Sequence, residues 1–331
     1  MPRVTLARHA MATRFEVVLH GPNPVALRAA GEEALDEIER LDAQLNLYNP
    51  ASEISHINAR AAAGPVRVEP GLFRLLLHAQ RLTLETAGAF DISVAPLMRC
   101  WGFMRDSGRL PTPEAVTAAR AVTGMQYVQL DERDFSVRFE RAGMMLDLGS
   151  IGKGYALDRA VEVLREAGVT SAMVHGGTST ACAVGAPPDS EAWKVAVERP
   201  ELARSERAGP DAPRSAADAN RNRPLAVVSL KDESLSMSAV WGKCFEAGGR
   251  TYGHVIDPRK GEPTEGAWLA VVVLPSATET DALSTALLIA GVAGHEAVMR
   301  LRPGMRTLVV GQGCQPGDYQ VAASGIVASG V

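Results

Sequence analysis

Hydrophobic side chains alternate with polar ones near the start of the chain, which indicates a half-buried strand over residues 11–19. A helix is expected next, because Asn23 is a favourable cap and Pro24 suits a first helical position. A second amphipathic helix is expected near residues 71–86. The apolar residues of the first helix fall three or four apart on one face: Leu27, Ala30, Ala34, Ile38, Leu41 and Leu45.

The second half of the chain combines short apolar runs with longer helical patterns. Helices are expected after the glycine–lysine turn, through Ala156 to Gly168, and from about Glu279 to Ala290, with a last helix–strand pair that ends at Val310. Short apolar runs predict strands at residues 172–174, 193–197, 225–230, 252–256 and 268–274.

These elements do not follow a steady strand–helix–strand rhythm, and the two strands that flank Gly248-Gly249 indicate a hairpin. The pattern favours an α+β fold with mainly antiparallel sheets covered by helices. We expect one unit over residues 1–331, with two intimately packed subdomains as the alternative. Residues 201–223 contain almost no large apolar side chain, so they are expected to form a flexible polar insertion.

Composition narrows the classes of function. The 331 residues are 46% hydrophobic, enough to bury a large core. A net charge of -4 and a pI near 6.0 give no basic field, so no nucleic-acid partner is expected. The cysteines are far apart and form no CxxC pair, which argues against a zinc ribbon or a dithiol redox site: Cys100, Cys182, Cys244 and Cys314.

The apolar segments bear on where in the cell the protein is located. No apolar run of about 18 residues is evident, so no stable transmembrane span is expected. The first residues lack the long apolar segment of a signal peptide. The expectation is therefore a cytoplasmic protein as the sequence stands, and a periplasmic or membrane-anchored one if an export signal is missing.

The segment from Leu146 to Tyr155 carries the first candidate chemistry. An apolar run breaks into three glycines, and Lys153 stands among them before a helical pattern. Glycines let a backbone approach a phosphate, a helix start offers unpaired N–H groups, and a lysine supplies a point charge. The segment suits a nucleotide, but an ordinary strand-to-helix turn with a solvated lysine is an equal interpretation.

A second candidate site lies on the helix expected near residue 279. Asp281, Ser284 and Thr285 are three and four residues apart and therefore share one helix face. One carboxylate and two hydroxyls can hold magnesium, which prefers oxygen ligands and often keeps waters or phosphates in its other positions. The alternative is ordinary helix chemistry, in which Asp281 complements the macrodipole and the hydroxyls bond local carbonyls.

Two further features complete the set of candidates. His254 lies at the end of an expected strand with Asp257 close in sequence, so it is a candidate general base or a structural histidine. The compact apolar segment from Gly88 to Leu97, with Trp101 after it, can wall a planar ring or form plain core.

Taken in order, these segments resemble the ApbE family, the FAD:protein FMN transferases, over nearly the whole chain. The family's motifs are Met-Gly-Thr, Ser-x-Tyr, Gly-Ala-Phe-Asp with Trp-Gly-Phe, Asp-Leu-Gly-x-Ile-x-Lys-Gly-Tyr, Gly-Gly, His-x-Ile-Asp-Pro and Ala-Asp-Ala-x-x-Thr. Their counterparts here are Met11 to Thr13, Tyr48, Gly88 to Asp91, Trp101 to Phe103, Asp147 to Tyr155, Gly176-Gly177, His254 to Pro258 and Thr280 to Thr285.

The resemblance implies an ApbE-like (T-fold-like) architecture and a magnesium-dependent transfer of FMN from FAD to a threonine hydroxyl of a partner flavoprotein, with release of AMP. The acceptor is expected to be a subunit of a redox complex. His254 would take the proton from the threonine, and Lys153 would neutralise phosphate charge. Magnesium would be bound by Asp281, Thr285 and the carbonyl of Gly152, with Ser284 as a further contact. The FAD site would be lined by Met11, Tyr48, Ala89, Phe90, Asp91, Lys153, Tyr155 and Ile256.

The chain also departs from the family pattern. Ala12 replaces the usual glycine, and Thr178 stands where an acid or amide is frequent. The segment from Ser238 to Trp241 replaces Ser-Gly-x-Tyr and adds bulk near the expected flavin or acceptor. An FAD pyrophosphatase that forms FMN and AMP, and a non-catalytic FAD-binding protein, are the alternative functions. All three depend on one expectation, that Lys153 and Asp281 converge in space.

Overall fold

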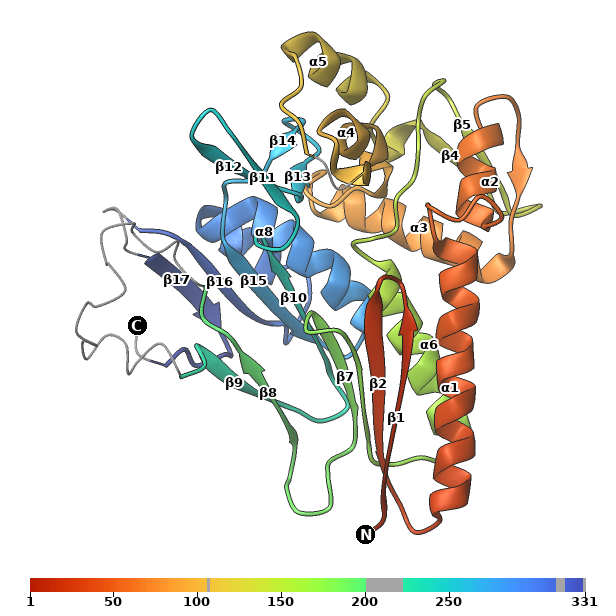
Figure 1. Ribbon diagram of the computed structural model, residues 1–331, viewed down its shortest axis with the longest axis vertical. Coiled ribbons are helices and arrows are strands. Elements are labelled where there is room, and N and C mark those ends of the chain that lie inside the picture. Colours follow the sequence, from red (N-terminus) through yellow and green to blue (C-terminus); the bar gives the residue numbers. More distant parts are fainter. Residues whose placement is uncertain (106–107, 201–222, 314–318, 330–331) are drawn as a thin grey trace.

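The computed structural model describes residues 1–105, 108–200, 223–313 and 319–329, so the expected polar insertion at 201–223 lies, except for Arg223, outside the described residues. The fold is built on an eight-stranded sheet (Figure 1) in the order β1-β2-β6-β7-β10-β15-β16-β17. Every neighbouring pair in it is antiparallel, which confirms the α+β prediction. The strands are β1 (Arg3–Ala10), β2 (Thr13–His20), β6 (Ala172–Gly176), β7 (Thr180–Val184), β10 (Ser234–Ala239), β15 (Leu269–Leu274), β16 (Arg306–Gln312) and β17 (Tyr319–Ser324).

Three long helices cover one face of this sheet (Figure 1): α1 (Pro24–Leu45), α6 (Gly152–Glu166) and α8 (Ala277–Met299). The expected start of α1 is confirmed, because the Asn23 side chain accepts hydrogen bonds from the N–H groups of Val25 and Ala26 at 3.1 and 3.2 Å. Alternate strand residues face these helices, as Val272 of β15 does in the main core. The fold thus places the starts of α6 and α8 against the same sheet.

The opposite face of the sheet is covered by a separate ribbon of β8 (Trp193–Val197) and β9 (Ala226–Leu230). Both strands were expected from their apolar runs. Residues of the sheet that point away from the helices, such as Met173 and Val271, form a second buried cluster with this ribbon. The main sheet therefore has a buried cluster on each face.

Smaller elements lie around one end of the sheet (Figure 1). The hairpin expected at Gly248-Gly249 is confirmed, and both glycines have positive φ, 57° and 75°. The helical elements are α2 (Glu53–Arg60), α3 (Pro70–Glu85), η1 (Ile92–Val94), α4 (Ala95–Cys100), η2 (Phe103–Arg105), α5 (Pro113–Ala121) and η3 (Met125–Tyr127). The short strands are β3 (Val66–Arg67), β4 (Val128–Asp131), β5 (Ser136–Phe139), β11 (Cys244–Ala247), β12 (Arg250–Gly253), β13 (Ile256–Asp257) and β14 (Glu262–Pro263).

Several boundaries differ from those expected. The first expected strand begins at Thr13, because Met11 and Ala12 form a turn with φ of 49° and 58° that joins it to β1. The strand expected over 252–256 is divided between β12 and β13, with His254 in the connection. Neither β1, β17 nor α2 was expected from the sequence.

Helix α8 runs past Ala290, where the sequence predicted its end. Gly291 has non-helical angles, φ 67° and ψ -170°, so the helix is kinked there. A β-carbon at Gly291 would lie 2.2 Å from the carbonyl oxygen of Gly266, which is why a larger residue does not fit. By length and composition α8 is also apolar enough to cross a membrane, which was not expected from the sequence. Its contacts with β10, β15 and β16 identify it as a core helix.

Candidate active site

A cavity of about 880 Å³ opens where α6 and α8 begin. Lys153, Asp281 and His254 all contribute to its wall. The Lys153 ammonium lies 3.7 Å from Asp281 Oδ1 and donates a hydrogen bond to the Gly149 carbonyl at 3.3 Å. The expected convergence of these two distant segments is therefore confirmed.

Gly154 makes this approach possible. Its N–H donates to Asp281 Oδ2 at 3.0 Å, across 127 residues of sequence. A β-carbon at this position would lie 2.1 Å from the Ala277 carbonyl oxygen. The two helices therefore cross at a point that only glycine can occupy.

The place of Lys153 differs from the expected turn before a helix. Helix α6 begins at Gly152, so Lys153 lies in its first turn, and the residues from Leu146 to Leu148 form no strand. A cation is unfavourable near a helix N-terminus. The Asp281 carboxylate offsets that cost.

The three residues of α8 expected to bind magnesium, Asp281, Ser284 and Thr285, differ in how deeply they are buried. Asp281, only 5% exposed, and Thr285 line the cavity, whereas Ser284 is fully buried. The hydroxyls of Ser284 and Thr285 lie within hydrogen-bonding distance of the Asp281 carbonyl, at 3.0 and 3.3 Å. These are the bonds to local helix carbonyls that the alternative interpretation of this segment predicted. Gly152, the expected carbonyl ligand, is buried at the start of α6.

Ser238 of β10 joins these residues, although no role in metal binding was expected for it. Its Oγ lies 2.8 Å from Ser284 Oγ and 3.2 Å from Thr285 Oγ1, and it lines the cavity. A sequence signal exists only in the departure of Ser238 to Trp241 from the family motif. The contact with α8 follows from the fold.

A cation at this site would have few protein ligands. Within the described ranges, no three His, Cys, Asp or Glu side chains cluster to hold a metal ion. Of the side chains expected to bind the metal, the Asp281 carboxylate and the Thr285 hydroxyl line the cavity, and both are hard oxygen groups. This sparse set fits magnesium, which commonly completes its coordination with waters and substrate phosphates.

His254 also lines the cavity, on the connection from β12 to β13. Its Nδ1 is 3.2 Å from the Lys243 carbonyl. Because a carbonyl can only accept, Nδ1 carries the proton of the neutral ring, and Nε2 is left as the acceptor. Burial lowers the pKa of His254, and the charges of Lys243 and Lys153 lower it further. The imidazole is therefore neutral near pH 7, as a general base must be.

Asp257, which the sequence placed beside His254, does not orient that ring. Its carboxylate is buried and forms a two-pronged pair with Arg259, at 2.8 and 2.9 Å. This pair holds the turn after β13.

Only some of the residues expected around FAD line the cavity. Ala89, Asp91 and Ile256 line the cavity with Lys153. The other four lie elsewhere: Met11 in the β1–β2 turn, Tyr48 61% exposed after α1, Phe90 fully buried in the core, and Tyr155 half-buried on α6.

Two carboxylates shape the wall beside Lys153. Asp91 accepts hydrogen bonds from the N–H and Oγ of Ser93 at 2.7 and 2.6 Å, and from the N–H of Met125 at 3.1 Å. Asp147 accepts from the N–H of Gly149 at 2.8 Å. Burial raises the pKa of both carboxyls, against those hydrogen bonds and, for Asp147, against the Lys153 charge. No role of its own was expected for Asp147 from the sequence.

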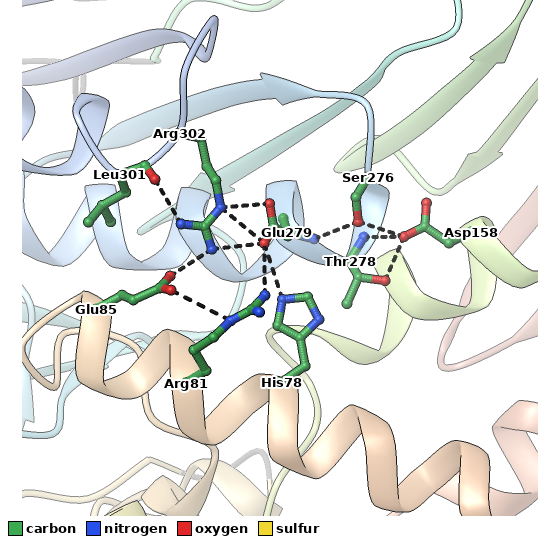
Figure 2. Close-up of polar contacts among 9 residues, drawn as sticks. All are labelled: His78, Arg81, Glu85, Asp158, Ser276, Thr278, Glu279, Leu301 and Arg302. Atoms are coloured by element: carbon green, nitrogen blue, oxygen red, sulfur yellow. Dashed lines mark hydrogen bonds and ion pairs between the residues drawn. The ribbon is translucent and has the colours of Figure 1, made fainter.

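The start of α8 is tied to α6 by Asp158 (Figure 2). One carboxylate oxygen accepts from the Ala277 N–H at 2.7 Å. The other accepts from the Ser276 hydroxyl at 2.8 Å and from the N–H and hydroxyl of Thr278 at 2.9 and 2.6 Å. These bonds satisfy polar groups at the helix start that have no partner within the helix. They also fix α8 relative to the helix that carries Lys153.

A second tie joins α8 to α3 (Figure 2). Glu279 accepts from Arg302 at 2.8 and 2.9 Å and lies 3.2 Å from His78 Nε2. Arg302 also donates to Glu85 at 2.6 Å. Burial alone would raise the pKa of Glu279, but the bonds from His78 and Arg302 outweigh it and lower the pKa to about 2. The carboxylate is therefore charged at every physiological pH.

Comparison with known proteins shows which family has this architecture. The model of the ApbE family matches residues 11–309. An FAD:protein FMN transferase of Salmonella typhimurium is 28% identical over 279 residues, which cover 83% of this chain and 74% of the relative. A protein of the same name from Treponema pallidum is 27% identical over 318 residues, with 92% and 83% covered.

Solved structures that superpose on this fold lead to the same family. The ApbE protein of Thermotoga maritima superposes with a TM-score of 0.81 at 25% identity, covering 98% of this chain and 97% of that one. The apo form of the Pseudomonas stutzeri flavinyl transferase ApbE gives a TM-score of 0.79 at 28% identity, with 98% and 95% covered. The chain therefore belongs to the ApbE family.

Proposed function

We propose that this protein transfers FMN from FAD to a threonine hydroxyl of a partner flavoprotein, in a magnesium-dependent reaction that releases AMP. The chain is a transferase, and the relatives reported above carry the name FAD:protein FMN transferase. The observation that carries the proposal is the meeting of Lys153, Asp281 and His254 in one cavity.

The reaction exchanges the phosphoanhydride bond of the FAD pyrophosphate for a phosphoester bond to the threonine. The threonine Oγ bonds to the phosphorus of the FMN half of FAD, and the bond from that phosphorus to the bridging oxygen breaks, so that AMP leaves with this oxygen. The threonine proton goes to Nε2 of His254, the free acceptor of the neutral ring. His254 then returns the proton to solvent.

Charge on the pyrophosphate must be neutralised as that bond breaks. The Lys153 ammonium lies beside Asp281 and can donate to a phosphate oxygen. Asp281 and Thr285 would hold magnesium, with the Gly152 carbonyl and Ser284 as the further ligands proposed from the family motif. Bound magnesium would supply positive charge to the non-bridging oxygens.

The test is an AMP assay with FAD and magnesium, run with and without candidate acceptor flavoproteins, together with a mass measurement for covalent FMN. We expect AMP and the FMN adduct to form together and only with an acceptor. AMP release without an acceptor would identify an FAD pyrophosphatase, and FAD binding without AMP would identify a carrier. Asp281→Asn is the matched variant, because its amide oxygen can still accept from the Gly154 N–H while the charge is lost.

A further inference from the structure

The strand β8 presents its edge to the cavity. Four consecutive residues, Trp193 to Ala196, line it. Side chains of consecutive strand residues point to opposite faces, so a wall built from consecutive residues is made by the edge of the strand. Among the described residues β8 pairs only with β9, which leaves its other edge with unpaired N–H and C=O groups.

An apolar floor lies below this edge. Met173 of β6, Ala181 of β7 and Met237 of β10 all line the cavity and belong to or pack against the buried cluster on the face away from the helices. Met237 is also fixed to the β6–β7 turn by its N–H bond to the Ser179 carbonyl at 2.7 Å. The result is a groove with a polar edge and an apolar floor, which we call the β8 groove.

The β8 groove is continuous with the proposed reaction site. Thr178 and Ser179, in the turn between β6 and β7, line the same cavity as Lys153, Asp281 and His254. Asp281 and Ser238 belong to the helix-covered side of the sheet, whereas Met173 and Ala181 belong to the other side. The cavity thus passes around the β6–β7 turn and reaches both faces.

We propose that the β8 groove binds an extended segment of the acceptor protein as an added strand along β8, and so brings its threonine to His254. This inference rests on the proposed function. A free strand edge is matched by another main chain, which repeats donors and acceptors at the same spacing. Alternate side chains of such a segment would contact the apolar floor, a second feature that a polypeptide supplies.

Two proline variants test the main-chain pairing. Adjacent strand residues direct their N–H groups to opposite edges, so Lys194→Pro and Val195→Pro each remove one donor, one facing β9 and the other facing the groove. The variant that loses the β9 bond unfolds at a lower temperature, and the variant that keeps the wild-type unfolding temperature is the informative one. In it we expect a rise of tenfold or more in KM for the acceptor that the wild type labels, with FAD affinity unchanged.

The second measurement does not depend on the folding of a variant. Peptides spanning the labelled threonine of that acceptor are synthesised with a single N-methyl group at each successive residue. Pairing along β8 predicts that methylation at alternate positions lowers transfer at least tenfold, while methylation between them has little effect. An effect that is uniform along the peptide, or absent, contradicts the inference.

The outcomes separate this inference from the proposed function. Labelling by the wild type, together with an unchanged acceptor KM in the stable proline variant and no alternation in the peptides, overturns the β8 groove alone. Failure of the wild type to label any acceptor overturns both.

Discussion

At the scale of single residues, His254 carries the clearest consequence of its surroundings. Its Nδ1 faces the Lys243 carbonyl, so only Nε2 can accept a proton. Burial lowers its pKa below the ordinary value of 6.5, and a base with a lowered pKa is neutral at and above that pH. We therefore expect the acidic limb of the kcat/KM profile to lie below pH 6.5 and to vanish in His254→Ala, which should still bind FAD. Titration of activity with a midpoint above pH 6.5 would exclude His254 as the base.

Ser238 supports a second prediction at this scale. Its hydroxyl contacts those of Ser284 and Thr285, and one neutral hydrogen bond contributes roughly 0.5–1.5 kcal/mol. We expect Ser238→Ala to weaken binding of magnesium or manganese about 2- to 10-fold in a direct titration, with kcat at saturating metal little changed.

The matched control is Ser236→Ala. Ser236 makes the equivalent bond to Thr280, at 2.8 Å, two residues earlier in the same strand. Equal metal affinity in both variants would show that Ser238 does not orient the ligand hydroxyls.

At the scale of elements, the site depends on how α8 is held at its start. Asp158 accepts four hydrogen bonds from the residues that begin this helix. Removing it leaves buried donors unsatisfied, so we expect Asp158→Ala to lower the free energy of unfolding by about 2–4 kcal/mol in urea denaturation. Glu166→Ala, at an exposed position of the same helix α6, should change it by less than about 0.5 kcal/mol. A similar loss in the two variants would contradict the capping role.

The tie between α8 and α3 predicts a pH dependence of stability. The pKa of Glu279 is about 2 in the folded protein against an ordinary 4.5, so the folded state favours the charged form. That contribution, roughly 3 kcal/mol, is present above pH 4.5 and is lost as the pH falls towards 2. We expect the stability difference between the wild type and Glu279→Gln, measured by denaturation between pH 2 and 7, to shrink over that range. A difference that stays constant would assign the effect to shape rather than charge.

Local signals explain which elements could be predicted. Helix α1 has its cap, its proline and its apolar spacing within one stretch of sequence, so its start at Pro24 was found. The edge strands β1 and β17 have polar or half-buried positions that weaken the alternation, and both were missed. The start of α6 at Gly152 could not be predicted either, because glycine is a poor helix former and the Gly154 N–H donates to Asp281, which lies 127 residues away in the sequence.

At the scale of the whole molecule, the sequence predicted which distant residues meet at the site better than it predicted the walls of the cavity. The order of motifs identified Lys153, His254, Asp281 and Thr285, which the fold gathers around one cavity. It could not show that Ser238 reaches α8, because that contact is made only when β10 packs on the helix. Residues from distant elements that complete a site across a sheet cannot be identified from the periodicity of the sequence.

The passage around the β6–β7 turn has a kinetic consequence. If the donor nucleotide occupies the helix side and the recipient chain lies along β8, each has its own approach, and both can be held at once. Initial rates measured with both concentrations varied should then give intersecting lines, the behaviour of a ternary complex. Parallel lines would mean that one partner must leave before the other enters.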